Sequence, residues 1–134
     1  MYREDTRHYR YFSSQDAAAD RLVHREEERR LGDERANPRS TDPDYLTLRQ
    51  RRRIFERWLS AIGQTSHVLD VGGRVQPYRS LLAAPSLYVG IDPILEGLVS
   101  VVAVGESLPF TARSFDLVFC TQVLSYVRDA TAVI

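Results

Sequence analysis

Two acidic residues and a pair of glycines lie where the edge of a parallel sheet would bind a nucleoside. The first apolar run of the C-terminal half contains Asp70 and leads into Gly72 and Gly73, and the second ends in Asp92, about 20 residues after Gly72. Glycines after a strand let the backbone turn tightly and approach a ligand. A carboxylate at the end of the next strand is placed to accept hydrogen bonds from two ribose hydroxyls.

Each of these features alone has an ordinary explanation. Two glycines after a strand more often form a simple turn, and an aspartate that ends a strand is commonly a turn residue or a helix cap. The combination is more informative, because ligands of open α/β sheets bind outside the carboxyl ends of the strands. We expect Asp70 and Asp92 to meet there with Glu106 and Thr121.

The elements that would position these residues alternate between strand and crossover. Short apolar runs bounded by turns predict four strands, at 67–72, 87–92, 98–104 and 114–120. Short helices are expected at 78–82 and 121–127, and Asp129 is placed to cap another. This pattern predicts an α/β fold with a Rossmann-like three-layer parallel sheet, incomplete at about four strands in the order 3-2-1-4.

Residues 1–65 differ in composition and predict a helical N-terminal extension or lid, separate from the domain at 66–134. One helix is expected at 15–31, with a cap at Ser13 or Ser14 and Gly32 as its terminator. Its apolar stripe is thin and comprises Ala18, Leu22 and Val23. A second helix is expected to begin with Asp42 as the cap and Pro43 in its first turn, and to end at Gly63. Its apolar stripe comprises Leu48, Phe55, Trp58, Leu59 and Ile62. The aromatic residues Tyr2, Tyr9, Tyr11 and Phe12 are expected in the same lid.

Composition excludes several classes of function. The 18 basic and 18 acidic side chains cancel, so no net charge attracts nucleic acid or an anionic membrane, and no apolar run could span a bilayer. The single cysteine, Cys120, forms no internal disulfide and fits a cytoplasmic protein. We expect no bound metal. The arginines of the second helix are interpreted as a solvated face rather than a nucleic-acid site; they are Arg49, Arg51, Arg52, Arg53 and Arg57.

The segments VLDVGG (68–73), YVGIDP (88–93) and GESLPFTARSFDLVFCTQVLSYVRD (105–129) together resemble class I S-adenosylmethionine (SAM)-dependent methyltransferases, of the methyltransferase type 11 or ubiquinone and menaquinone type. The resemblance covers the C-terminal half of the chain and the N-terminal half of such a domain. It implies SAM as the cofactor. The residues that it implies for SAM binding are Asp70, Gly72, Gly73, Asp92, Gly105, Glu106, Thr121 and Gln122.

The resemblance assigns these residues to parts of SAM. Asp70 and the two glycines would hold the methionine and ribose portions, and Asp92 the ribose hydroxyls. Gly105 and Glu106 would lie beside the adenine. Thr121 and Gln122 would lie near the methionine end.

The chain departs from the family pattern at three places. A third glycine is missing from the loop, which continues as Arg74-Val75-Gln76-Pro77-Tyr78-Arg79. Val104 stands where many members carry an acidic residue, and Ser125-Tyr126 replaces a Glu-His pair. A dinucleotide-binding enzyme would need G-x-G-x-x-G before a long helix, and this loop leaves little room for a pyrophosphate.

The sequence indicates no catalytic residue. Methyl transfer from a sulfonium mainly requires alignment of the acceptor and exclusion of water, and it requires a base only if the acceptor must lose a proton. Tyr126 is interpreted as a core residue, as aromatic residues on helices usually are, and the alternative is that it approaches the methyl donor. Two functions remain open: methyl transfer to an unidentified small molecule, and a non-catalytic remnant or interaction module. Because the domain stops after four strands, we expect a truncated chain that binds SAM weakly, and a partner chain or oligomer that covers the fourth strand.

Overall fold

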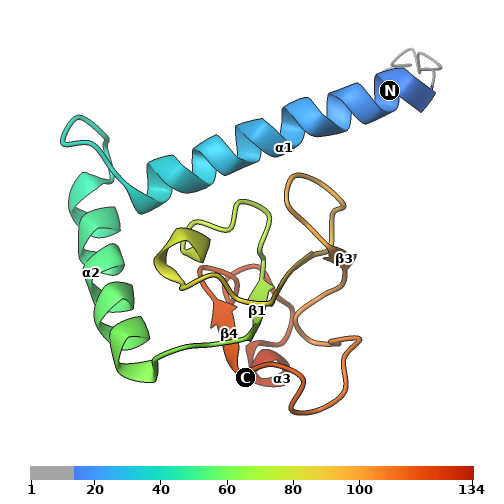
Figure 1. The fold of residues 1–134 in the computed structure, drawn as a ribbon. Helices are drawn as coiled ribbons and strands as arrows, with labels where there is room; N and C mark the ends of the chain where they lie inside the picture. Colours follow the sequence, from blue (N-terminus) through green and yellow to red (C-terminus); the bar gives the residue numbers. More distant parts are fainter. Residues whose placement is uncertain (1–13) are drawn as a thin grey trace, which may run out of the picture.

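The computed structural model describes the backbone of residues 14–134 and the side chains from residue 22 onward. The predicted cap at Ser13 and the aromatic residues of the expected lid at positions 2–12 lie outside the described residues. The elements follow in the order α1 (Ser14–Ala36), α2 (Tyr45–Ile62), β1 (His67–Val71), η1 (Arg79–Leu81), β2 (Leu87–Asp92), β3 (Val101–Val102), β4 (Leu117–Cys120) and α3 (Ala130–Val133). Figure 1 shows α1 and α2 as two long helices beside the strands.

The four strands form one parallel sheet in the order β3-β2-β1-β4, which confirms the predicted order and direction. β1 lies at the centre, where Asp70 aligns with Gly90 of β2 and with Phe119 of β4. β3 is short and pairs only at the end of β2, where Asp92 aligns with Val102. Because all strands run in one direction, their carboxyl ends share one edge of the sheet.

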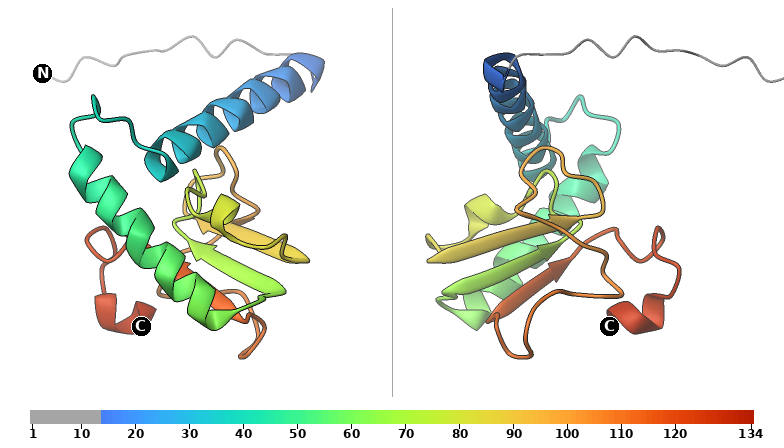
Figure 2. Two further views of the ribbon diagram at one scale, coloured as in Figure 1. Left: turned by 60° about the vertical axis from the view of Figure 1, so that its left-hand side comes forward. Right: turned by 90° about the vertical axis from the view of Figure 1, so that its right-hand side faces the viewer.

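The two faces of the sheet are covered differently. On one face, Val68, Tyr88 and Phe119 pack with Leu59 and Phe55 of α2, and Figure 2 shows α2 crossing this face. On the other face, alternate residues of β1 and β2 pack against side chains from the loops that follow β3 and β4. These strand residues are Leu69, Val71, Val89 and Ile91. The strict alternation of side chains along a strand accounts for the two clusters.

α1 contacts the rest of the molecule through a stripe that the sequence did not reveal. Glu28, Gly32 and Ala36 are buried at four-residue steps, whereas Leu22 and Val23 of the predicted apolar stripe are exposed. The prediction that Gly32 ends the helix was wrong. The absent side chain instead lets the helix backbone lie against the loop after β1, and the helix ends at Ala36, shortly before Pro38.

Substitution of Gly32 with alanine is expected to displace α1. A Cβ atom at this position would lie 2.1 Å from the carbonyl oxygen of Val75, and a backbone atom has little freedom to move away. Overpacking of this kind commonly costs about 1–3 kcal/mol. Urea unfolding measures the loss. Gly63→Ala is the comparison, because no atom lies within 4 Å of its Cβ and only the cost of its positive φ of 82° applies.

α2 begins later than predicted. The helix starts at Tyr45, and the carboxylate of Asp42 accepts a hydrogen bond from the backbone N–H of Arg39 at 2.6 Å, so Asp42 stabilises the preceding turn. The predicted end is confirmed, since the N–H of Gly63 bonds to the carbonyl of Leu59. Of the predicted apolar stripe, Leu59 is buried, Leu48 and Phe55 are half-buried, and Trp58 and Ile62 are exposed.

Arg52 joins the two long helices. Its guanidinium donates to the backbone carbonyl of Ala36 at 2.8 Å and to the side-chain oxygen of Asn37, both at the end of α1. The same side chain pairs with Glu56 within α2. This contact links the two helices and satisfies a carbonyl group that the end of α1 leaves without an intrahelical partner.

Three predictions for the C-terminal half needed correction. The expected strand at 98–104 contains only Val101–Val102, because Val104 pairs with Ser107 in a turn. The strand expected at 114–120 begins only at Leu117. Residues 121–127 form turns rather than a helix, and Gln122 has a φ of 59°, a left-handed conformation that interrupts a helix. Asp129 caps α3 as expected, accepting from the N–H groups of Thr131 and Ala132.

Within the described residues, β4 has β1 as its single neighbour, and Val118 is exposed. The partner chain expected at this edge therefore stays a prediction. None of the described helices is both long enough and apolar enough to cross a membrane.

Candidate functional site

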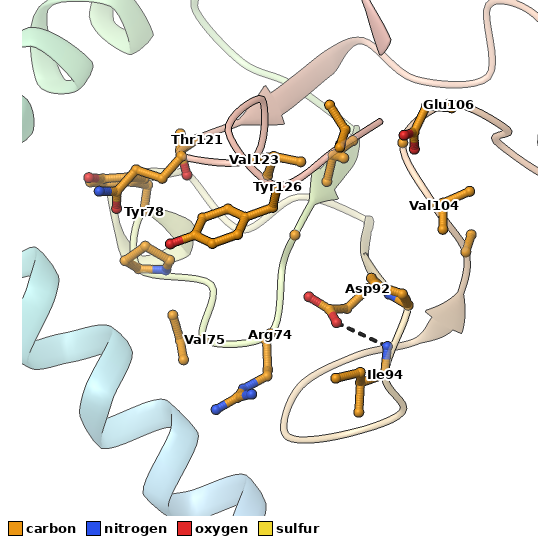
Figure 3. Close-up of a pocket in the computed structure, with 18 of the residues that line it drawn as sticks. Arg74, Val75, Tyr78, Asp92, Ile94, Val104, Glu106, Thr121, Val123 and Tyr126 are labelled. Carbon is orange, nitrogen blue, oxygen red and sulfur yellow. Dashed lines mark hydrogen bonds between the residues drawn. The ribbon is translucent and has the colours of Figure 1, made fainter. Parts of the chain in front are cut away.

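A cavity of about 1300 Å³ opens at the carboxyl ends of the strands. Its walls come from the turns after β1, β2 and β4, from the loop after β3, and from the helices α1 and α2. Figure 3 shows labelled side chains from these turns and loops around one space. Since ligand pockets commonly measure about 300–1,000 Å³, this cavity has room for more than one small molecule.

The glycine turn after β1 is attached directly to the end of β2. The N–H groups of Gly72 and Gly73 both bond to the carbonyl oxygen of Ile91, at 2.9 and 3.0 Å. Gly72 has a φ of 73°, which favours glycine, and a Cβ atom there would lie 2.6 Å from Val123. These bonds hold the turn beside Asp92, the residue that follows Ile91.

Asp92 presents its carboxylate to the cavity. One oxygen, Oδ1, accepts a hydrogen bond from the backbone N–H of Ile94 at 3.0 Å, which fixes the side chain at the end of β2 (Figure 3). Among residues 22–134, the other oxygen has no protein hydrogen-bond donor. One carboxylate oxygen is thus available to accept a hydrogen bond from a ligand.

Asp70 lies outside the cavity, on the other side of β1 from Val71. It is buried, and its carboxylate accepts a hydrogen bond from the hydroxyl of Tyr88 at 2.7 Å. Burial raises the pKa of the Asp70 carboxyl to about 6, although the hydrogen bond from Tyr88 acts in the opposite direction. Gly73 also does not line the cavity, and its backbone packs on Asp70. Asp70 therefore packs beneath the turn at Gly73 and does not face the cavity.

The other residues that the resemblance implied lie together in the cavity wall: Gly72, Asp92, Gly105, Glu106, Thr121 and Gln122. Glu106 has a structural contact, because its carboxylate accepts from the N–H of Arg128 at 2.8 Å. Hydrogen bonds from backbone N–H groups, its own first and then that of Arg128, lower the pKa of this carboxyl. The roles of these residues toward a ligand remain predictions.

The loop that lacks the third glycine is built from buried side chains. Gln76 donates to the carbonyl of Leu98 at 2.8 Å and accepts from Arg79 at 2.9 Å. Tyr78 belongs to the aromatic cluster, with its ring centroid 4.2 Å from that of Phe55. The guanidinium of Arg79 lies 4.9 Å from the ring centroid of Tyr88. This loop therefore anchors the glycine turn on the sheet.

Sequence reasoning missed the residues that the N-terminal helices contribute. Glu28 and Arg35 of α1 and Arg51 of α2 line the cavity. Glu28 is buried and pairs with Arg74 at 3.0 Å, and Arg74 also pairs with Glu96 at 3.3 Å. The second carboxylate oxygen of Glu28 is buried without a hydrogen-bond partner. The available signal in the sequence was Glu28, which lies in line with the small residues Gly32 and Ala36 at four-residue steps along α1.

Tyr126 is not the core residue that the sequence suggested. Its side chain is 87% exposed, and Figure 3 shows it pointing into the cavity. The predicted helix at 121–127, which would have turned it toward the core, is a series of turns. The ring therefore forms part of the cavity wall and is available for contact with a ligand.

The parallel sheet in the order 3-2-1-4, with a cavity at its carboxyl edge, defines an α/β protein of the Rossmann-like class. Residues 69–134 match the methyltransferase domain family. The predicted resemblance to class I SAM-dependent methyltransferases is thereby confirmed over this segment, and the family generally uses SAM. No curated protein and no solved structure matches the chain.

Proposed function

We propose that the cavity binds SAM and that the domain transfers its methyl group to a small-molecule acceptor. The observation that carries the proposal is the meeting of Gly72 and Asp92 at one cavity wall, where both glycine N–H groups are bonded to the carbonyl of Ile91. Membership of residues 69–134 in the methyltransferase domain family supports the same reaction.

The residues present fit this cofactor. The unoccupied carboxylate oxygen of Asp92 suits the ribose hydroxyls, and the exposed side chain of Ile94 beside it suits the apolar face of the adenine. Gly72 lets the backbone approach the ligand where a side chain would fill the space. Thr121 and Gln122 would lie near the methionine end. SAM, when bound, supplies a methyl group already activated by the sulfonium.

The contribution of the chain is to orient the reactants and exclude water. α1 and α2 form the cavity walls beyond the sheet edge, and Tyr126 contributes an aromatic surface to the wall. Rigid alignment of an acceptor with the methyl carbon accounts for much of the rate of such a reaction. The cavity of about 1300 Å³ leaves space for the acceptor next to the donor.

Substitution of Asp92 with asparagine tests SAM binding. Asparagine keeps the oxygen that accepts from Ile94 but lacks the charged oxygen proposed to bind the ribose. We expect the affinity for SAM and for S-adenosylhomocysteine to fall about 10-fold or more, because hydrogen bonds to a charged group are worth about 1.5–3 kcal/mol. Calorimetric titration of the wild-type chain and the variant measures the change.

Asp33→Asn is the matched control, since Asp33 is exposed on α1 and does not line the cavity. Its affinity should equal that of the wild type. Equal affinities of all three proteins for SAM would contradict the assignment of Asp92. So would adenosine titrations in which the wild type and Asp92→Asn bind equally tightly.

A further inference from the structure

Two arginines of the N-terminal helices contribute to the cavity wall. Arg35 comes from α1 and Arg51 from α2, and both line the cavity. The guanidinium of Arg51 donates to the side-chain oxygen of Gln122 at 2.9 Å. Tyr78 lines the same cavity, and burial raises the pKa of its hydroxyl, whereas Arg51 and Arg35 act against this rise. The cavity wall therefore carries two positive charges from the N-terminal helices.

These charges are not neutralised by the described part of the chain. Arg30, Arg52 and Arg74 pair with glutamates, whereas neither Arg35 nor Arg51 has an acidic partner within 4.0 Å among residues 22–134. Four carboxylates of the described residues line the same cavity. At the end of β2, Asp92 keeps one oxygen without a donor from the described part of the chain, and Asp129 caps α3. Glu28 pairs with Arg74, and Glu106 accepts from the N–H of Arg128. Two like charges in the wall of one cavity favour the binding of an anion there.

We infer that Arg35 and Arg51 form a binding site for a carboxylate or phosphate group of a ligand. Guanidinium groups suit such groups because their parallel N–H donors match two oxygens of the anion. The site adjoins Gln122, at the end of the cavity where the methionine portion of SAM is proposed to lie. The anion is either the α-carboxylate of SAM or an acidic group of the methyl acceptor. The choice between these two sources rests on the proposed function, but the site itself does not.

Titrations of the full chain with three probes test the site and distinguish the two sources. The probes are S-adenosylhomocysteine, 5′-methylthioadenosine, which has the same nucleoside without the amino acid, and inorganic phosphate at constant ionic strength. The variants are Arg35→Gln, Arg51→Gln and Arg51→Lys. Arg53→Gln is the matched control, because Arg53 is exposed on α2 and does not line the cavity. Melting temperatures without ligand verify that each variant is folded.

The expected result is a loss of anion affinity of about 10-fold in each glutamine variant and a smaller loss in the lysine variant, which keeps the charge. If the α-carboxylate of SAM is the anion, the loss is seen with S-adenosylhomocysteine and is absent with 5′-methylthioadenosine. If the acceptor supplies the anion, both nucleosides bind the variants as they bind the wild type, and phosphate binding measured with S-adenosylhomocysteine present is lost.

The inference is overturned if Arg35→Gln and Arg51→Gln bind all three probes as tightly as Arg53→Gln does. Failure of the proposed function gives a different result: the wild-type chain then binds neither nucleoside. In that case phosphate alone decides the question. If phosphate raises the melting temperature of the wild type and of Arg53→Gln, but not that of Arg35→Gln or Arg51→Gln, the anion site is supported even though SAM does not bind.

Discussion

Replacement of Phe119 with alanine is expected to lower the free energy of unfolding by about 3–5 kcal/mol, the usual cost of removing a buried phenylalanine. Phe119 is 4% exposed and is the buried residue of β4. Its ring centroid lies 5.8 Å from that of Phe55 on α2 and 6.2 Å from that of Tyr78. The cavity left by the ring would therefore loosen the helix, the strand and the loop after β1 together.

Urea unfolding followed by tryptophan fluorescence measures this loss, because Trp58 lies on α2 and its ring centroid is 5.8 Å from that of Phe55. For the control, Trp58→Ala, unfolding is followed by circular dichroism. Trp58 is 58% exposed, so its removal should cost about 1 kcal/mol or less despite its size. Equal losses for Phe119→Ala and Trp58→Ala would show that the aromatic cluster does not anchor α2 to the sheet.

Replacement of Asp70 with asparagine is expected to stabilise the protein at pH 8 and to have little effect at pH 4. The pKa of the buried carboxyl rises from 3.8 to about 6 in the folded protein, so ionisation opposes folding. Stability associated with this group is therefore greatest below pH 4, falls as the pH rises through 6, and is constant above. A shift of this size corresponds to about 3 kcal/mol at most.

Asparagine keeps an oxygen that can accept the hydrogen bond from Tyr88 and carries no charge at any pH. Burial, followed by the charge of Asp70, raises the pKa of the Tyr88 hydroxyl, so this group remains a donor throughout the range. Urea unfolding of both proteins between pH 4 and pH 8 gives the difference. Backbone N–H groups lower the pKa of Glu106 and Asp116, and these carboxyls affect both proteins equally. Parallel stability profiles would contradict the prediction.

The sheet could be predicted because its signals are local. Short apolar runs bounded by glycine, proline and aspartate marked β1 and β2 almost to the residue, and the parallel order follows from alternating strands and crossovers. The errors arose where tertiary contacts override local preference. Gly32 lies inside α1 because the loop after β1 packs against it, and the backbone of Gln122 adopts a left-handed conformation in the turn after β4.

The candidate site could be predicted in part for the same reason. Gly72 follows β1 directly and Asp92 is the last residue of β2, so the geometry of a parallel sheet brings them to one cavity. Asp70 lies one position before Val71, and the alternation of side chains turns it to the opposite face, toward Tyr88. Arg51 was assigned to a solvated face from helical periodicity, and Arg35 was not considered. Neither could be placed in the cavity, because the contact of a helix with a loop distant in sequence leaves no local pattern.

The ion pair between Glu28 and Arg74 joins α1 to the residue that follows the glycine turn. Free energies coupled through such a contact act equally in both directions. If α1, when attached, raises the affinity for a ligand that orders the turn, then that ligand strengthens the attachment of α1. The factor is the same in both directions. We therefore expect sequence changes along the inner stripe of α1 to alter binding at the strand edge even where they touch no ligand atom.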